Sequence, residues 1–171
     1  ILIDTFQVVA VINAGTAGGM DVRLEIFDTV AAETAAYHDV AEDILTEFHP
    51  WMTTPRFAAD PRLLAAAKRA AGRLGRRIWF GPVVTGEQFI GEEGRAEILE
   101  RFAPLSADME TAAAAHVCYV NQVPFLALRT ITDTARRSGV ETFEENCRKA
   151  SEIARDLTLL VLEELKEDAA P

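Results

Sequence analysis

Apolar residues along this chain form two kinds of run, short ones typical of strands and longer ones with the three-to-four-residue spacing of helices. Short runs rich in β-branched residues predict strands at residues 8–13, 78–85 and 125–131, and residues 27–37 carry mixed strand signals. Stretches with helical spacing lie between them. This alternation predicts an α/β protein with a largely parallel or mixed central sheet.

The clearest helix is expected to begin at Asp60-Pro61, because aspartate caps a first turn well and proline fits the first helical position. Leucines and alanines at helical spacing continue it to Gly75, a residue type that commonly ends helices. Further helices are expected at residues 92–102 and 109–122, and near the C-terminus, where Thr142 and Glu145 fit a capping box.

The remaining segments show less regular patterns. Residues 38–55 predict a loop or an interaction surface. We find no repeat, linker or low-complexity tract, so residues 1–171 are expected to form a single domain. The first residue is Ile rather than Met, and residues 1–6 resemble the last turn of a helix, which predicts that an N-terminal segment is missing.

The chain is acidic: 17 Lys and Arg stand against 27 Asp and Glu, giving a formal net charge of -10 at pH 7. A nucleic-acid partner is therefore not expected, since phosphate backbones attract basic surfaces. No apolar run reaches the length of a membrane span. Cys118 and Cys147 lie in helical patterns without metal-ligand spacing. These features predict a cytoplasmic protein with reduced thiols and no metal site.

Two carboxylates occur where apolar runs end or change character, Glu110 at the start of a helix and Asp133 just past a strand. In a parallel α/β sheet, ligands bind beyond the carboxyl ends of the strands. Glu110 could accept hydrogen bonds from sugar hydroxyls, or serve only the helix dipole if Asp108 caps the helix. Asp133 could be a general acid whose pKa is raised by partial burial, or only a turn residue.

Three further features have both a functional and a structural interpretation, and the residues alone favour the structural one. Residues 13–19, Asn-Ala-Gly-Thr-Ala-Gly-Gly, predict a tight loop after the first strand, although glycines also let backbone amides approach a ligand. Phe89 and Ile90 could contact a flat base or belong to the core. His116, in the middle of a helical pattern, is expected to be a core histidine.

Four motifs, in order, resemble those of the nucleoside phosphorylase and nucleosidase family. They are GTAGG after the first strand, FI after the Gly86 turn, DMET at a helix start and ITDTA after a strand. The run AHVCYVNQVPFLALRTITD, from Ala115 to Asp133, is especially similar to the bacterial branch that acts on 5′-methylthioadenosine and S-adenosylhomocysteine. The resemblance extends over essentially the whole chain. It implies a three-layer α/β/α sandwich with a central mixed sheet, N-terminally incomplete.

The resemblance also implies roles for individual residues at the ribose end of a substrate pocket. Thr16, Ala17 and Gly18 would line the region of the ribose and the catalytic water. Met109 and Glu110 would hold the ribose, with Glu110 on its hydroxyls.

At the base end, the resemblance implies that Phe89 stacks on the purine while the main chain of Ile90 contacts its edge. Asp133 would be the general acid that protonates the leaving adenine, assisted by Thr132. No metal or organic cofactor is implied.

The implied reaction is hydrolysis of the N-glycosidic bond of 5′-methylthioadenosine, S-adenosylhomocysteine or a related 5′-substituted adenosine, releasing adenine. Family phosphorylases carry basic residues for phosphate, including one shortly before the glycine motif, whereas residues 11–14 here contain no cation. Water is therefore the expected nucleophile, and a purine nucleoside or uridine phosphorylase of the same fold is the first alternative. A second alternative is a catalytically inactive nucleoside-binding or interaction protein, because the family's water-activating glutamate precedes anything in this chain.

The segment after Tyr37-His38-Asp39 departs from a Phe-Gly-Tyr-type sequence found in relatives, which leaves the 5′ substituent of the substrate open. In the family this region lies near a dimer contact. Phe48, Trp51 and Met52 are aromatic or Met side chains of the kind enriched in interfaces. The alternative is that they fold onto their own core. With the resemblance, we expect a homodimer.

Overall fold

The computed structural model describes residues 1–47, 52–91, 94–137 and 139–168. In this part of the chain a six-stranded mixed sheet forms in the order β3-β2-β4-β5-β1-β6. The strands are β1 (Val11–Gly19), β2 (Thr29–Tyr37), β3 (Phe57–Ala58), β4 (Ile78–Thr85), β5 (Ser106–Asp108) and β6 (Phe125–Thr134). The sheet also curls back on itself, because β2 pairs with β6 in antiparallel register from Thr29↔Thr130 to Ala31↔Leu128.

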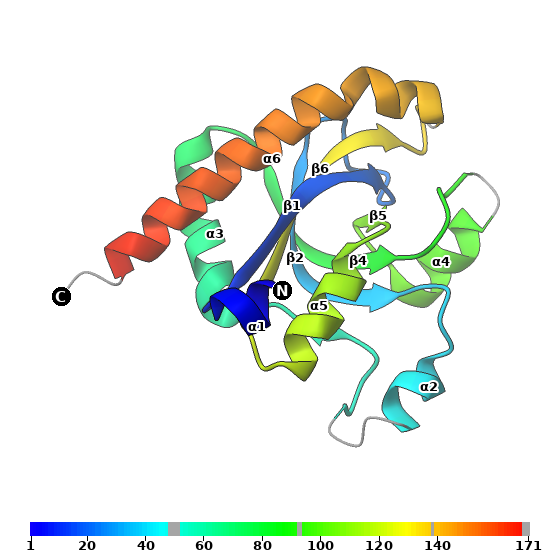
Figure 1. Ribbon diagram of the computed structural model, residues 1–171. Helices are drawn as coiled ribbons and strands as arrows, with labels where there is room; N and C mark the ends of the chain where they lie inside the picture. Colours follow the sequence, from blue (N-terminus) through cyan, green and yellow to red (C-terminus); the bar gives the residue numbers. More distant parts are fainter. Residues whose placement is uncertain (48–51, 92–93, 138, 169–171) are drawn as a thin grey trace.

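Helices cover both faces of this sheet (Figure 1). They are α1 (Leu2–Phe6), α2 (Glu42–Glu47), α3 (Pro61–Leu74), α4 (Arg95–Phe102), α5 (Thr111–Val120) and α6 (Val140–Asp168). One apolar cluster joins α3 and α6 to the sheet through residues such as Leu63, Leu126 and Leu157. A second cluster joins α5 to the sheet through Ala112, Ala115 and Ile131. The predicted three-layer α/β/α arrangement with a mixed sheet is therefore confirmed; the closure of the sheet was not predicted.

Helix α3 forms as its end signals predicted. The Asp60 carboxylate accepts hydrogen bonds from the backbone N–H groups of Arg62 and Leu63, at 2.9 and 3.1 Å. Pro61 occupies the first turn, and Gly75 closes the helix in the left-handed conformation with φ 64°. Capping bonds of this kind satisfy N–H groups that a helix leaves unpaired at its start. Strand β4 likewise matches the predicted residues 78–85.

The glycine-rich segment after the first apolar run was predicted to be a tight loop. This prediction is wrong, because the segment forms the second half of β1. It pairs with β6 from Val11↔Phe125 to Gly19↔Thr134, with a bulge between Ala17 and Gly18. Its glycines make room for side chains of β6. A Cβ on Gly15 would lie 2.7 Å from the Arg129 guanidinium, and one on Gly18 would lie 3.2 Å from the Asp133 carboxylate.

Other boundaries also differ from the expectation. Strand β6 continues to Thr134, so Asp133 lies inside a buried strand rather than after it. Helix α6 begins at Val140, which places Thr142 and Glu145 within the helix, so the predicted capping box is wrong. Gly139, with φ 119°, precedes the helix and provides the turn that the capping box was expected to mark.

The segment 38–55 contains a short helix, α2, where a loop was predicted. Leu45 is 6% and Met52 is 5% exposed, and both belong to the core cluster on the α5 side of the sheet. Met52 therefore packs onto its own chain. Phe48 and Trp51 lie outside the described residues, and the interface expected there stays a prediction.

Candidate active site

A pocket of about 310 Å³ opens at the ends of several strands. All nine residues singled out from the sequence line it: Thr16, Ala17, Gly18, Phe89, Ile90, Met109, Glu110, Thr132 and Asp133. They come from the end of β1, the loop after β4, the end of β5 with the start of α5, and the end of β6. The volume falls at the lower end of the range of small-molecule sites. The fold thus gathers these distant residues around one cavity.

Asp133 is a buried carboxyl group on the wall of this pocket, with 2% of the residue exposed. The Thr132 hydroxyl donates to its Oδ1 at 2.9 Å, with the Ala17 carbonyl oxygen as a more distant acceptor at 3.3 Å. Burial raises the pKa of Asp133, and the Thr132 hydrogen bond and the charge of Arg95 oppose this in part. The expected direction of the shift is confirmed. A carboxyl group of this kind holds a proton to higher pH than an exposed one.

Glu110, unlike Asp133, is exposed to solvent: 63% of its side chain is exposed, and its carboxylate pairs with Arg129. The guanidinium of Arg129 is buried and lies 3.2 Å from Asp108 and 3.3 Å from Glu110. It also donates to the Thr111 hydroxyl at 2.9 Å and to the Asn13 side chain. Glu110 is thus the solvent-facing end of a buried ionic network.

Asp108 is the residue that caps α5. Its Oδ1 accepts the backbone N–H groups of Glu110 and Thr111, at 3.1 and 2.9 Å, and the Thr85 hydroxyl at 2.7 Å. Glu110 makes no capping hydrogen bond with its side chain. Asp108 thus caps the helix, which is the condition on which the helix-dipole interpretation of Glu110 depends, so the capping geometry agrees with both interpretations of Glu110.

Apolar side chains complete the pocket. Phe89 and Met109 are 45% and 46% exposed, so their side chains are open to a ligand in the pocket that they line. Val140 and Phe143, from the first turn of α6, line the cavity as well. Aromatic and apolar walls with a few polar groups are typical of sites for flat organic molecules.

Sequence reasoning missed two basic residues of the site. Arg129 was available as a signal, since it is the one charged residue in the predicted apolar strand at residues 125–131, and charges are almost never fully buried unless paired. Arg95 lines the pocket and donates to the Gly19 carbonyl oxygen at 2.8 Å. It follows Glu92-Glu93-Gly94, a charged stretch that resembles an ordinary solvated helix start.

His116 packs among aromatic rings instead of lining this pocket. Its ring stacks on Phe57 with centroids 4.9 Å apart, next to Tyr37. That placement agrees with the expected structural role. In the described ranges, no helix is both long and apolar enough to cross a membrane, and no group of three or more His, Cys, Asp or Glu residues could hold a metal ion.

Fold and pocket together define an α/β protein with a site for a small organic molecule at the ends of its strands. The sequence profile of the Phosphorylase superfamily matches residues 1–163, and the chain belongs to this family. The predicted family is thereby confirmed.

Individual relatives agree with the family match. The chain is 35% identical over 172 residues to the 5′-methylthioadenosine/S-adenosylhomocysteine nucleosidase of Actinobacillus succinogenes, covering 97% of this chain and 74% of that protein. The structure is similar to that of the corresponding nucleosidase from Neisseria meningitidis in complex with methylthio-immucillin-A. That match has a TM-score of 0.84 and 31% identity, and covers 94% of this chain and 72% of the other. It is also similar to futalosine hydrolase of Helicobacter pylori, with a TM-score of 0.85, 27% identity, and 95% and 71% coverage.

Proposed function

We propose that this protein hydrolyses the N-glycosidic bond of a 5′-substituted adenosine, with 5′-methylthioadenosine and S-adenosylhomocysteine as the first substrates to test. The observation that carries the proposal is the pairing of two different carboxyl groups in one pocket. Asp133 is buried with a raised pKa, while Glu110 is exposed and paired with Arg129. The names of the relatives described above point to the same chemistry.

In the proposed mechanism the environment of each group sets its role. Asp133 donates its proton to a ring nitrogen of the adenine as the bond to the sugar carbon breaks, so that the base leaves neutral. Glu110 accepts hydrogen bonds from the ribose hydroxyls and stabilises the positive charge that develops on the sugar. Water then adds to the sugar carbon and releases one proton to the solvent, and Asp133 takes up a proton again, so that the net products are adenine and a free pentose. Phe89 would stack on the base, beside the main chain of Ile90.

The remaining predicted residues complete the proposed contacts. Thr132 orients the Asp133 carboxyl through its hydroxyl. Thr16, Ala17 and Gly18 would line the ribose and the water, and Met109 would pack against the sugar. Glycine at residue 18 makes room for the acid, since a Cβ there would lie 3.2 Å from Oδ2 of Asp133.

The choice between water and phosphate depends on the cations near the ribose. Arg129 approaches the glycine segment, but its charge is already matched by Asp108 and Glu110. A phosphate ion at this point would meet the Glu110 carboxylate, which opposes its binding. Around Arg129, this charge balance favours hydrolysis over the alternative phosphorylase function.

The test is to incubate the purified protein with 5′-methylthioadenosine with and without phosphate. We expect adenine and free pentose in both cases, with ¹⁸O from labelled water in the pentose. Accumulation of a pentose 1-phosphate would establish the phosphorylase instead. Binding of adenosine analogues without any turnover would leave the nucleoside-binding protein as the function.

We further propose a cytoplasmic homodimer that takes part in methionine salvage, on the family resemblance alone. Sedimentation of the active protein at micromolar concentration tests the assembly. A fully active monomer would contradict the dimer. Trp51→Ala, in the segment predicted to contact the partner, is expected to weaken dimerisation and to raise KM for substrates with bulky 5′ groups.

A further inference from the structure

Arg95, the first residue of α4, reaches into the pocket from an element that the proposed chemistry does not otherwise use. Its Nη1 donates to the Gly19 carbonyl oxygen at 2.8 Å, which fixes the guanidinium against β1. In the sheet, Gly19 pairs with Thr134 and Gly18 pairs with Asp133. A Cβ on Gly18 would lie 3.2 Å from Oδ2 of Asp133. Gly19, which holds the Arg95 guanidinium, is therefore the neighbour of Gly18, the residue paired with Asp133 in the sheet.

The charges around Asp133 make Arg95 its electrostatic partner. In the described part of the chain, the charged residues that line the pocket are Arg95, Asp108, Glu110 and Asp133. Asp108 and Glu110 both pair with Arg129. Among the ion pairs of the described residues, none includes Arg95. The positive charge that acts on Asp133 is that of Arg95.

The other elements around Asp133 present uncharged groups. β1 contributes its glycines and the Ala17 carbonyl oxygen. The neighbouring Thr132 contributes its hydroxyl, and on α6 the Asn146 amide bonds to the Thr132 carbonyl oxygen at 3.0 Å. Burial of the guanidinium lowers the pKa of Arg95, and Asp133 raises it in part. Arg95 is thus a half-buried cation in the pocket that holds the fully buried acid.

We propose that Arg95 stabilises the Asp133 carboxylate as it forms, when the acid gives its proton to the leaving base. This inference rests on the proposed function. As the O–H bond of Asp133 breaks and the N–H bond of the base forms, negative charge appears on Asp133. A cation already held in place by a backbone hydrogen bond stabilises this charge without reorganisation. Burial keeps the proton on the resting acid, and Arg95 makes its release easier.

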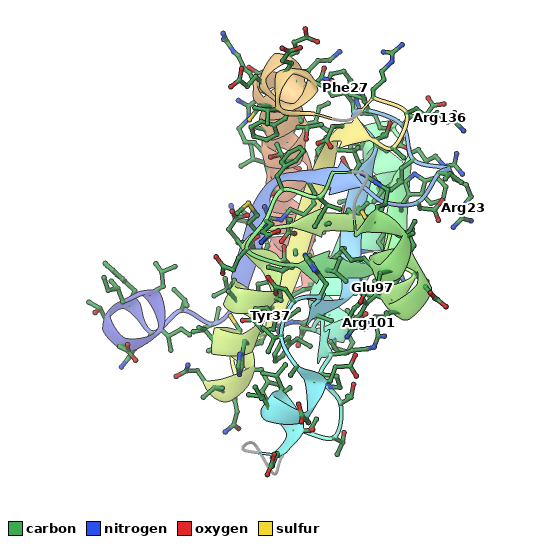
Figure 2. The ribbon with its side chains drawn as sticks, turned by 90° about the vertical axis from the view of Figure 1, so that its right-hand side faces the viewer. Arg23, Phe27, Tyr37, Glu97, Arg101 and Arg136 are labelled. Carbon is green, nitrogen blue, oxygen red and sulfur yellow. The ribbon has the colours of Figure 1, made fainter. Side chains whose placement is uncertain are left out.

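Two substitutions separate charge from structure. Arg95→Gln keeps a hydrogen-bond donor for the Gly19 carbonyl but removes the charge, whereas Arg95→Lys keeps the charge. Arg101→Gln is the matched control, because it removes the same charge from the outer side of α4, where Arg101 lies 3.6 Å from Glu97 (Figure 2).

For Arg95→Gln we expect kcat to fall about tenfold, a fraction of the total effect of a general acid, with KM little changed. Loss of the cation removes an influence that lowers the pKa of Asp133, so this pKa rises further. The acid then stays protonated to higher pH, and the alkaline limb of the kcat/KM profile shifts to higher pH. Arg95→Lys and Arg101→Gln should stay close to the wild type. The proposal is wrong if Arg95→Gln keeps the wild-type rate and the wild-type alkaline limb of the pH profile. It is also wrong if Arg95→Gln retains as much activity as Arg95→Lys.

Two measurements keep this result separate from the proposed function. Binding of a 7-deaza adenosine analogue, which lacks the ring nitrogen to be protonated, should be unchanged by Arg95→Gln; a large loss of binding would indicate a structural role and overturn the proposal. If the wild type releases no base at all, the proposed function fails. The titration of Asp133, followed by ¹³C NMR with Asp133→Asn for assignment, still tests Arg95: an Asp133 pKa unchanged by Arg95→Gln would contradict the inference.

Discussion

The Arg129 guanidinium lies 3.3 Å from the Glu110 carboxylate, so that a buried cation holds an exposed side chain at the edge of the pocket. The guanidinium also pairs with the buried carboxylate of Asp108, at 3.2 Å. Orientation of Glu110 is therefore set inside the protein, before any ligand arrives. Side chains prepared in this way lose less conformational freedom on binding. The two partners of this pair should respond differently to substitution.

Glu110→Gln is expected to impair substrate binding with little effect on stability. Glu110 is 63% exposed on its side chain, so little packing is lost. The loss of charged hydrogen bonds to the ribose should raise KM roughly 10- to 100-fold, and kcat should fall as well, because the variant no longer stabilises the positive charge that develops on the sugar. Steady-state kinetics together with a melting curve measure both effects. A wild-type KM for the nucleoside would show that Glu110 does not hold the sugar.

Arg129→Met is expected to destabilise the whole protein. The substitution leaves the buried Asp108 carboxylate without its cation, and breaking a buried pair on one side costs about 3–5 kcal/mol. Urea unfolding measures this loss. Arg148→Met is the control, because the side chain of Arg148 is 92% exposed and its pair with Glu152 lies on the surface. The control should change stability by less than about 0.5 kcal/mol; equal losses for the two variants would contradict the network.

Asp133→Asn should lower kcat by about 10²–10⁴-fold and remove the alkaline limb of the pH profile. Burial raises the pKa of Asp133 above 3.8, so the wild type loses its acid, and its rate, as pH rises through the folded-state value. The variant keeps a neutral group at every pH. Near-wild-type turnover of 5′-methylthioadenosine by this variant would exclude Asp133 as the acid.

The same shift has a consequence for stability. The folded state holds the Asp133 proton more tightly than the unfolded chain. The contribution of this proton to the free energy of unfolding is therefore complete below pH 3.8 and declines as pH rises through the folded-state pKa. Asp133→Asn avoids the buried charge. We therefore expect the melting temperature of the variant, relative to the wild type, to be higher at pH 8 than at pH 4. The opposite trend would mean that the carboxylate is stabilised in the fold.

Local signals predicted the elements whose ends depend on local contacts. Helix α3 begins and ends where Asp60 and Gly75 indicated, because a cap involves only neighbouring residues. The glycine segment was misjudged for the opposite reason. Its strand conformation depends on pairing with β5 and β6, about 90 and 110 residues away, and nothing in the segment itself shows these partners.

The site shows the same division. Motifs with a characteristic order identified nine of the residues that line the pocket. Arg129 and Arg95 were missed because their roles depend on partners from other parts of the chain. Arg129 meets Asn13 and Asp108, and Arg95 meets Gly19. The positions of these partners follow from the sheet order, which the chain's periodicity does not determine.

Gly86 was predicted as a turn residue, but the imidazole of His38 is the better reason why residue 86 is a glycine, because the ring occupies the place of a side chain. A Cβ on Gly86 would lie 2.1 Å from Nε2 and 2.5 Å from Cε1 of His38. Neither backbone can easily move away. The His38 N–H donates to the Thr85 carbonyl oxygen at 3.0 Å, and the Gly86 N–H donates to the Asp108 carbonyl oxygen at 3.1 Å. The ring would have to leave its place.

Gly86→Ala should therefore destabilise the protein by about 1–3 kcal/mol, as overpacked sites do, and should raise KM, because Gly86 leads into the loop that carries Phe89 and Ile90. His38→Ala removes the obstacle. In the double variant the added methyl group fits the vacated space, so its loss should be smaller than the sum of the two single losses by at least about 0.5 kcal/mol. Urea unfolding of all four proteins measures this coupling. Additive losses would show that the ring of His38 is not what requires glycine at residue 86.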